Sequence, residues 1–153
     1  MKPNFIRPIA ICVFRNDGRI LAVEGYDPIK GQIFYRPPGG GIEYGEHSTV
    51  AIERELAEEL GVAVVDLRYL GTVENIFTHD GRMGHEIVMV YDGAFADRSL
   101  YNQGFIEGVE DDGQSFRAVW VRPSDCANPA APPVYPTGLL ELLARHPISD
   151  EPG

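Results

Sequence analysis

The segment 48–60 constrains the fold most, because it carries the strongest helical pattern in the chain. It consists of good helix formers, and Gly61 stands where a left-handed C-terminal cap is expected. Its length predicts a helix about 20 Å long. On a helical wheel, Val50, Leu56 and Leu60 form an aliphatic side, whereas glutamates occupy a separate arc of about 100°. One face can therefore pack against a sheet while the other carries chemistry.

Residues typical of β-strands lie on both sides of this helix. Segments 6–14 and 19–24 flank Asn16-Asp17-Gly18, and Asp-Gly is a tight-turn signal, so we predict a hairpin. A short strand is expected at 32–35, inside a glycine- and proline-rich loop, 25–45. Further strands are predicted at 62–77, with a break near Gly71, at 85–95 and at 115–121, and a closing helix at 138–145.

The length and composition indicate one ordinary domain, residues 1–153. Strands before and after one strong helix predict an α/β arrangement with a mixed sheet packed by helices. The apolar runs are too short to cross a bilayer, and the N-terminal residues lack a secretory pattern. We therefore expect no membrane partner and a cytoplasmic location. Cys12 and Cys126 match no metal-binding spacing and are expected to be free thiols.

The formal net charge of −10 limits the partners. So acidic a surface repels a polyanionic backbone, which argues against long DNA or RNA. A small phosphate-bearing substrate would need a cation to bridge it to the protein.

Three glutamates of the helix, Glu55, Glu58 and Glu59, are spaced i, i+3, i+4. Carboxylates at this spacing repel by about 0.2 to 0.5 kcal/mol per pair, which a protein tolerates easily. One interpretation is therefore a solvated acidic face, partly neutralised by Arg54. The other is a site for a hard cation, because magnesium is held by carboxylates together with substrate phosphates. The spacing alone does not decide between them.

The surrounding pattern is more specific. Gly40 is followed by five residues, Glu46, seven residues and the run Arg54-Glu55-Leu56-Ala57-Glu58-Glu59-Leu60-Gly61-Val62. Residues 40–62 thus resemble the box of the Nudix, or MutT-like, hydrolases at every fixed position. The resemblance implies an α/β fold of α+β type, an α/β/α sandwich with a mixed β-sheet and a loop-helix-loop box. It also implies hydrolysis of the diphosphate linkage of a small nucleoside diphosphate derivative, such as a nucleotide sugar, a dinucleotide or a nucleoside triphosphate.

The resemblance also implies roles for single residues. Glu55, Glu58 and Glu59 become ligands of magnesium, with manganese as an alternative ion. Arg54 is expected to pair with a neighbouring carboxylate and orient it. Glu46 would support the loop or reach the metal through water.

The general base has several candidates. A box glutamate is favoured, with Glu55 as the example, because a base must reach the proton that it removes. An acidic loop predicted at 96–114 offers alternatives, although these residues could also form a plain solvated cluster. The loop candidates are Glu107, Glu110 and Asp111.

The segment before the helix could bind phosphate. Arg36 offers a guanidinium, and Gly39, Gly40 and Gly41 could offer backbone N–H groups, although such a sequence also forms plain turns. Side chains that could stack on a ring, or could equally belong to the core, are Tyr26, Phe34, Tyr35 and Phe77. Within the strand that starts at His85-Glu86, at most one of the pair can point into a cleft.

Two other functional classes are compatible with the sequence. A non-hydrolytic Nudix-like module would bind a nucleotide as a sensor, and an interaction protein could use residues 129–136 for docking. The complete set of box carboxylates favours the hydrolase over both. The sequence leaves the substrate, the number of metal ions and a homodimer open.

Overall fold

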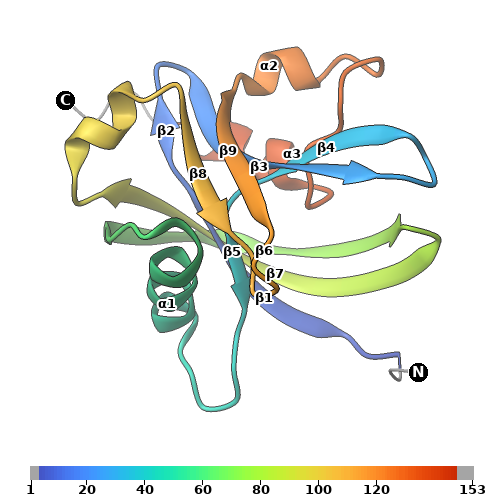
Figure 1. Cartoon of the computed structure of the whole chain (residues 1–153), viewed down its shortest axis with the longest axis horizontal. Coiled ribbons are helices and arrows are strands. Elements are labelled where there is room, and N and C mark those ends of the chain that lie inside the picture. The colour runs from blue at the N-terminus through green and yellow to red at the C-terminus, as the bar shows by residue number, and fades with distance from the viewer. Residues whose placement is uncertain (1–3, 148–153) are drawn as a thin grey trace.

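The computed structural model describes residues 4–147, which form two β-sheets with helices packed against them (Figure 1). The first sheet has the order β5-β1-β7-β6. β1 runs parallel to β7, whereas β1–β5 and β6–β7 are antiparallel, so the predicted mixed sheet is confirmed. Its strands are β1 (Arg7–Val13), β5 (Gly39–Gly41), β6 (Val64–His79) and β7 (Arg82–Phe95).

The second sheet is antiparallel throughout. It has the order β2-β3-β9-β8, and β4 pairs with β3 beyond that path. Its strands are β2 (Arg15–Asn16), β3 (Arg19–Asp27), β4 (Gln32–Arg36), β8 (Phe105–Val109) and β9 (Ser115–Val121).

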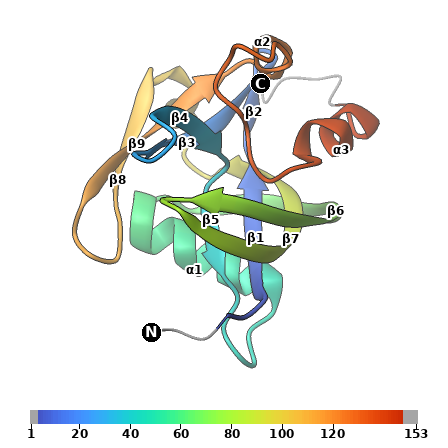
Figure 2. The ribbon, with the colours of Figure 1, turned by 90° about the vertical axis from the view of Figure 1, so that its right-hand side faces the viewer.

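Helices cover both faces of the first sheet (Figure 2). Along β1, Ala10 and Cys12 pack into the core cluster that contains Ile52 and Leu56 of α1 (Ser48–Leu60). The alternate residues, such as Ile11, pack with the leucines of α3 (Leu139–Arg145) on the other face. The result is the expected α/β/α sandwich. The remaining helices are short, namely η1 (Arg98–Asn102) and α2 (Pro123–Cys126).

Local sequence signals predicted several elements correctly. The helix begins and ends at the expected residues, and Gly61 is left-handed at φ 66° with its N–H donating to the Ala57 carbonyl at 3.2 Å. The β6–β7 turn at Asp80 and Gly81 has positive φ at both residues. The pairing of β6 with β7 shifts register next to Gly71, where a break was expected.

Three predictions about strands were wrong. β1 does not pair with β3, because its neighbours are β5 and β7, and the Asp17-Gly18 turn instead joins β2 to β3. The loop predicted at 25–45 contains β5, three glycines held by pairing with β1. The loop predicted at 96–114 contains η1 and β8, whose alternate residues Ile106 and Gly108 are buried.

Cys12 and Cys126 are both free thiols. None of the helices within residues 4–147 has the length and apolar character needed to cross a membrane.

Candidate active site

The box helix α1 is fixed at its start and along one side. The hydroxyl oxygens of Ser48 and Tyr91 lie 2.6 Å apart, which ties the first turn to β7. Ile52 and Leu56 are buried in the core. Because these residues occupy the inner face, the glutamates of the same helix are presented to the preceding loop and to β8.

Arg54 joins this helix to the preceding loop. Its Nε and Nη2 donate to the two carboxylate oxygens of Glu46 at 2.8 and 2.9 Å, and Nη2 also donates to the Gly41 carbonyl at 3.0 Å. Glu46 further accepts the Glu43 backbone N–H at 3.0 Å. These hydrogen bonds, the one from Arg54 above all, lower the pKa of Glu46 to about 2. Of the two roles expected for Glu46, the geometry therefore fits support of the loop.

Glu55 lies against the backbone of Gly40. A Cβ at Gly40 would lie only 2.5 Å from the Glu55 carboxyl carbon, so the carboxylate occupies space that any side chain would fill. Arg54 Nη1 donates to Glu55 Oε1 at 2.9 Å, and the Glu55 side chain is 12% exposed. The backbone of Gly40 is thus in close contact with a carboxylate, and its contact with phosphate stays a prediction.

Glu59 is the centre of an acidic cluster, defined here as Glu55, Glu59, Glu110 and Asp111. Burial raises the pKa of Glu59 to about 8, with further contributions from Glu55, Glu110 and Asp111. The pKa of Glu110 is raised as well, first by burial and then by its acidic neighbours. Two parts of the chain, α1 and the turn after β8, therefore bring mutually repelling carboxylates together.

Glu58 and Glu107 lie outside this cluster. Glu58 is 52% exposed and its carboxylate accepts from Arg54 Nη1 at 3.4 Å. Glu107 pairs with Arg117 across β8–β9, and it alternates with buried residues, so it faces away from α1. The structure thus brings Glu110 and Asp111, but not Glu107, to the box.

The donor chemistry of the acidic cluster fits a divalent cation. Within residues 4–147, no group of three Asp, Glu, His or Cys side chains is already arranged to hold a metal ion, and Arg54 Nη1 contacts both Glu55 and Glu58. However, crowded carboxylates with a raised pKa are groups whose repulsion a cation would relieve, and their oxygens are the ligands that magnesium prefers.

Arg36 stands next to the acidic cluster at the end of β4. Its guanidinium offsets part of the rise in the pKa of Glu110 that burial and the acidic neighbours cause, and its Nη2 lies 3.9 Å from Glu86 Oε1. The neighbouring glycines allow close packing of the chain. Gly39 is packed on the β1 backbone and Gly41 lies beneath the Arg7 side chain, and phosphate binding by their N–H groups stays a prediction.

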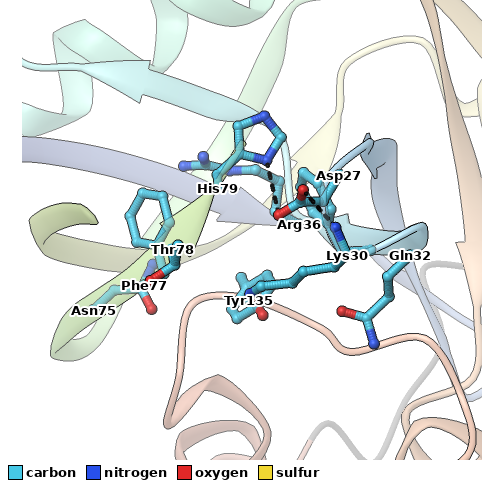
Figure 3. Close-up of a pocket in the computed structure, with 10 residues that line it drawn as sticks. Asp27, Lys30, Gln32, Arg36, Asn75, Phe77, Thr78, His79 and Tyr135 are labelled. Carbon is cyan, nitrogen blue, oxygen red and sulfur yellow. Dashed lines mark hydrogen bonds and ion pairs between the residues drawn. The ribbon is translucent and has the colours of Figure 1, made fainter. Parts of the chain in front are cut away.

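Beyond Arg36, the two sheets enclose a narrow cavity, called the slot below (Figure 3). Sequence reasoning identified Arg36, Phe34 and Phe77 as candidates but missed most of its lining. Alternation along β4 and β6 could have grouped residues of one strand, but nothing local indicates that the two strands face each other. The lining residues that matter below are Asp27, Gln32, Phe34, Arg36, Asn75, Phe77, His79 and Tyr135.

The remaining residues that were predicted to stack on a ring or to face a cleft lie in different places relative to the slot. Tyr26 is exposed and Tyr35 alternates with the slot residues of β4, so neither lines the slot. Glu86 is buried and bonded to Asn75, whereas His85 points the other way, 3.6 Å from Glu74. Only one of the His85-Glu86 pair therefore faces the slot side, as expected.

Comparison with known proteins agrees with this architecture. Over 75 residues the chain is 35% identical to a putative mutator protein MutT4 of Mycobacterium tuberculosis, covering 49% of this chain and 30% of that protein. It is 37% identical over 82 residues to an RNA pyrophosphohydrolase of Caulobacter vibrioides, covering 52% and 42%. The matched segments thus span less than half the length of these relatives.

Several solved structures resemble nearly the whole chain. A MutT NUDIX hydrolase from Burkholderia pseudomallei superposes with a TM-score of 0.64 at 26% identity, over 92% of this chain and 99% of that one. Residues 5–139 match the NUDIX domain. This match covers most of the chain and includes both sheets, α1 and the slot. The chain therefore belongs to the NUDIX domain family.

Proposed function

We propose that this protein hydrolyses a phosphoric anhydride bond in a small nucleoside diphosphate derivative, using a divalent cation held by Glu55, Glu58 and Glu59. The observation that carries the proposal is the acidic cluster beside Gly40, with Arg36 at its edge and Arg54 bonded to Glu55 inside it and to Glu58 next to it. The names of the relatives and of the superposed structure support the same reaction class.

Catalysis at this site involves three tasks, two performed by arginines and one by the bound cation. Arg36 offers a charged donor to phosphate oxygens at the border between the acidic cluster and the slot. Arg54 holds Glu46 and Glu55, which fixes the loop and one carboxylate relative to α1. A bound magnesium or manganese ion would supply positive charge that offsets the charge developing on the phosphoryl oxygens.

Hydrolysis adds water across the P–O–P bridge, and a base must accept the water's proton. Among the expected candidates, Glu55, Glu110 and Asp111 lie in the acidic cluster, and Glu107 does not. Glu55 remains the favoured base because it lies on the fixed helix, in contact with Gly40. Glu110 is the alternative, since a raised pKa makes its carboxylate a stronger base near neutral pH.

The test is hydrolysis of nucleoside triphosphates, nucleotide sugars and dinucleoside polyphosphates, with magnesium or manganese and with product identification. We expect Glu58→Gln and Glu59→Gln to lower turnover by about a hundredfold or more, through weaker cation binding. Glu53→Gln is the matched control, because Glu53 lies on the same helix and is exposed. Full activity of the double variant would refute the ligand assignment. Binding of nucleotides without turnover by the unaltered protein would favour a sensor.

A further inference from the structure

Two rows of side chains from different sheets face each other across the slot (Figure 3). The rows are Gln32, Phe34 and Arg36 on β4, and Asn75, Phe77 and His79 on β6. Because alternate residues of a strand share a face, each row runs from the acidic cluster toward a hairpin tip. The inner end lies at Arg36 and Asn75, and the outer end at Gln32 and His79.

The aromatic rings in the middle of the slot are fixed by their own strands. Phe34 lies opposite Gly25, and Phe77 lies opposite Gly84. A Cβ would lie 2.5 Å from the Phe34 ring at Gly25, and 2.3 Å from the Phe77 ring at Gly84. Each ring thus rests on a glycine of the neighbouring strand. The distance between the two rings therefore depends on how the two hairpins are held together.

Asp27 fastens the hairpins at the outer end. Its carboxylate accepts the backbone N–H groups of Ile29 and Lys30, in its own turn, at 3.0 and 3.2 Å. It also accepts the Asp80 N–H at 3.3 Å, from the β6–β7 turn of the other sheet, and lies 3.8 Å from His79 Nδ1. The Asp27 side chain is only 4% exposed. One buried carboxylate thus connects the two tips.

The inner end has a separate fastening. Glu86 accepts from Asn75 Nδ2 at 3.3 Å and lies 3.9 Å from Arg36, while Asn75 Oδ1 accepts the Thr137 N–H at 3.0 Å. A change at Asp27 should therefore loosen the outer end while leaving the inner end, beside the acidic cluster, in place.

The slot is too narrow to hold a ligand without movement. Its free volume is about 50 Å³, whereas pockets for small molecules enclose roughly 300 Å³ or more. A shallower hollow of about 310 Å³ adjoins it over Phe77 and Tyr135. A ring that enters the slot must move its walls apart, and the contacts of Asp27 oppose that movement at the outer end.

We propose that Asp27 is a positioning residue that sets substrate selectivity by holding the two hairpin tips together. With the tips fastened, the walls can move apart only far enough for one ring-sized group next to the phosphates. Substrates whose chain continues past the tips, such as the triphosphorylated end of an oligonucleotide, are excluded. This inference rests on the proposed function, and it concerns the part of the substrate that does not react.

The test compares Asp27→Asn with the unaltered protein on two substrates, a nucleoside triphosphate and a 5′-triphosphorylated trinucleotide with the same first base. The asparagine keeps the size of Asp27 but offers one acceptor oxygen in place of two. We expect the preference for the mononucleotide, as a ratio of kcat/KM values, to fall by about tenfold or more, mainly through a lower KM for the trinucleotide. An Asp27→Asn ratio within twofold of the unaltered protein's would overturn the proposal.

Asp80→Gly is the matched control. It removes the same charge from the same pair of tips, but it keeps the N–H that Asp27 accepts and suits the φ of 51° at this position. Its ratio should stay within twofold of the unaltered value. A tenfold fall in this control as well would show that charge, and not the fastening, sets the preference.

Amide hydrogen exchange tests the fastening without catalysis. We expect the Asp80 N–H to exchange at least about tenfold faster in Asp27→Asn, and unchanged exchange would refute the proposal. If that variant does not fold, His79→Ala takes its place, because His79 is 45% exposed and contacts both Asp27 and Phe34. It should shift the ratio about threefold in the same direction, and no shift would refute the proposal. If the unaltered protein cleaves no anhydride, the proposed function fails, and exchange still decides whether Asp27 fastens the tips.

Discussion

Adjacent glycines at the start of the box should respond in opposite ways to the same substitution. Gly39 and Gly40 both lie on β5, yet an added Cβ would meet different atoms. At Gly39 it would lie 2.1 Å from the Ala10 carbonyl oxygen, and at Gly40 it would lie 2.5 Å from the Glu55 carboxyl carbon. Backbone cannot move aside cheaply, whereas the end of a glutamate side chain can. We therefore expect Gly39→Ala to impair folding and Gly40→Ala to impair activity.

The loss of stability that we expect for Gly39→Ala has two causes. An ordinary carbon–oxygen contact is about 3.3 Å, so β1 and β5 would have to separate by about 1 Å. Overpacking of this kind costs about 1 to 3 kcal/mol. The φ of 152° is unfavourable for alanine and adds about 1 to 3 kcal/mol. Their sum, about 2 to 6 kcal/mol, corresponds to a fall in Tm of roughly 5 to 20 °C for a chain of this size.

The cost at Gly40 should be small for stability and large for catalysis. The Glu55 carboxylate would leave its position and weaken its contact with Arg54, and a partly exposed ion pair contributes at most about 1 kcal/mol. The Tm should therefore fall by no more than about 4 °C. Turnover should fall by about tenfold or more, because small displacements of a positioned catalytic group cost about that much.

The assay pairs thermal unfolding by circular dichroism with hydrolysis at saturating magnesium, for both variants and the unaltered protein. Gly45→Ala serves as a control on the same loop, because an added Cβ there meets nothing within 4 Å and only its φ of 83° is unfavourable. Equal losses of Tm in Gly39→Ala and Gly40→Ala, or full activity in Gly40→Ala, would refute this account of the two positions.

Two further predictions concern single residues of the box. Because the folded pKa of Glu46 is about 2, below its ordinary 4.5, its stabilising contribution is present above pH 4.5 and is lost as the pH falls toward 2. The free energy of unfolding in urea, measured across this pH range, should change less with pH in Glu46→Gln than in the unaltered protein. Identical pH dependence in the two proteins would contradict the lowered pKa of Glu46. Gly61→Ala should destabilise the protein by about 1 to 2 kcal/mol in urea unfolding, through the left-handed backbone alone, without changing kcat/KM. A loss of activity at equal stability would contradict that reading.

Local signals in the sequence were sufficient to predict α1 and the turns. The helix ends at Gly61 because glycine adopts the left-handed conformation that closes it, and such a requirement is visible in one residue. The Asp17-Gly18 turn was also visible, but the partner of β1 was not. β1 pairs with β5 and β7 and is buried on both faces, so its sequence is a continuous apolar run. Such a run does not indicate which strands lie beside it.

The functional site was predictable only in its local part. The order of Arg54, Glu55, Glu58 and Glu59 along one helix is a short-range pattern, and Arg54 joins Glu55 and Glu58 to the preceding loop. The slot depends on β4, β6 and Tyr135, which are far apart in the chain. Tyr135 reaches it because residues 133–135 pair with Tyr35 through backbone hydrogen bonds. Backbone pairing of this kind cannot be predicted from the side chains involved.

The distribution of charge near the box supports the cation of the proposed function. The chain carries a formal net charge of −10, and two arginines beside the acidic cluster already have acidic partners, Arg54 in Glu46 and Glu55, and Arg36 in Glu86 and Glu110. A phosphate brought to about 4 Å from one carboxylate of the acidic cluster would meet a repulsion of roughly 4 kcal/mol for each pair of charges. One shared guanidinium cannot offset several such pairs. Under the proposed function, we therefore expect a polyphosphate to bind here together with a divalent cation that lies between the two anionic groups, and each of the two ligands should raise the affinity for the other.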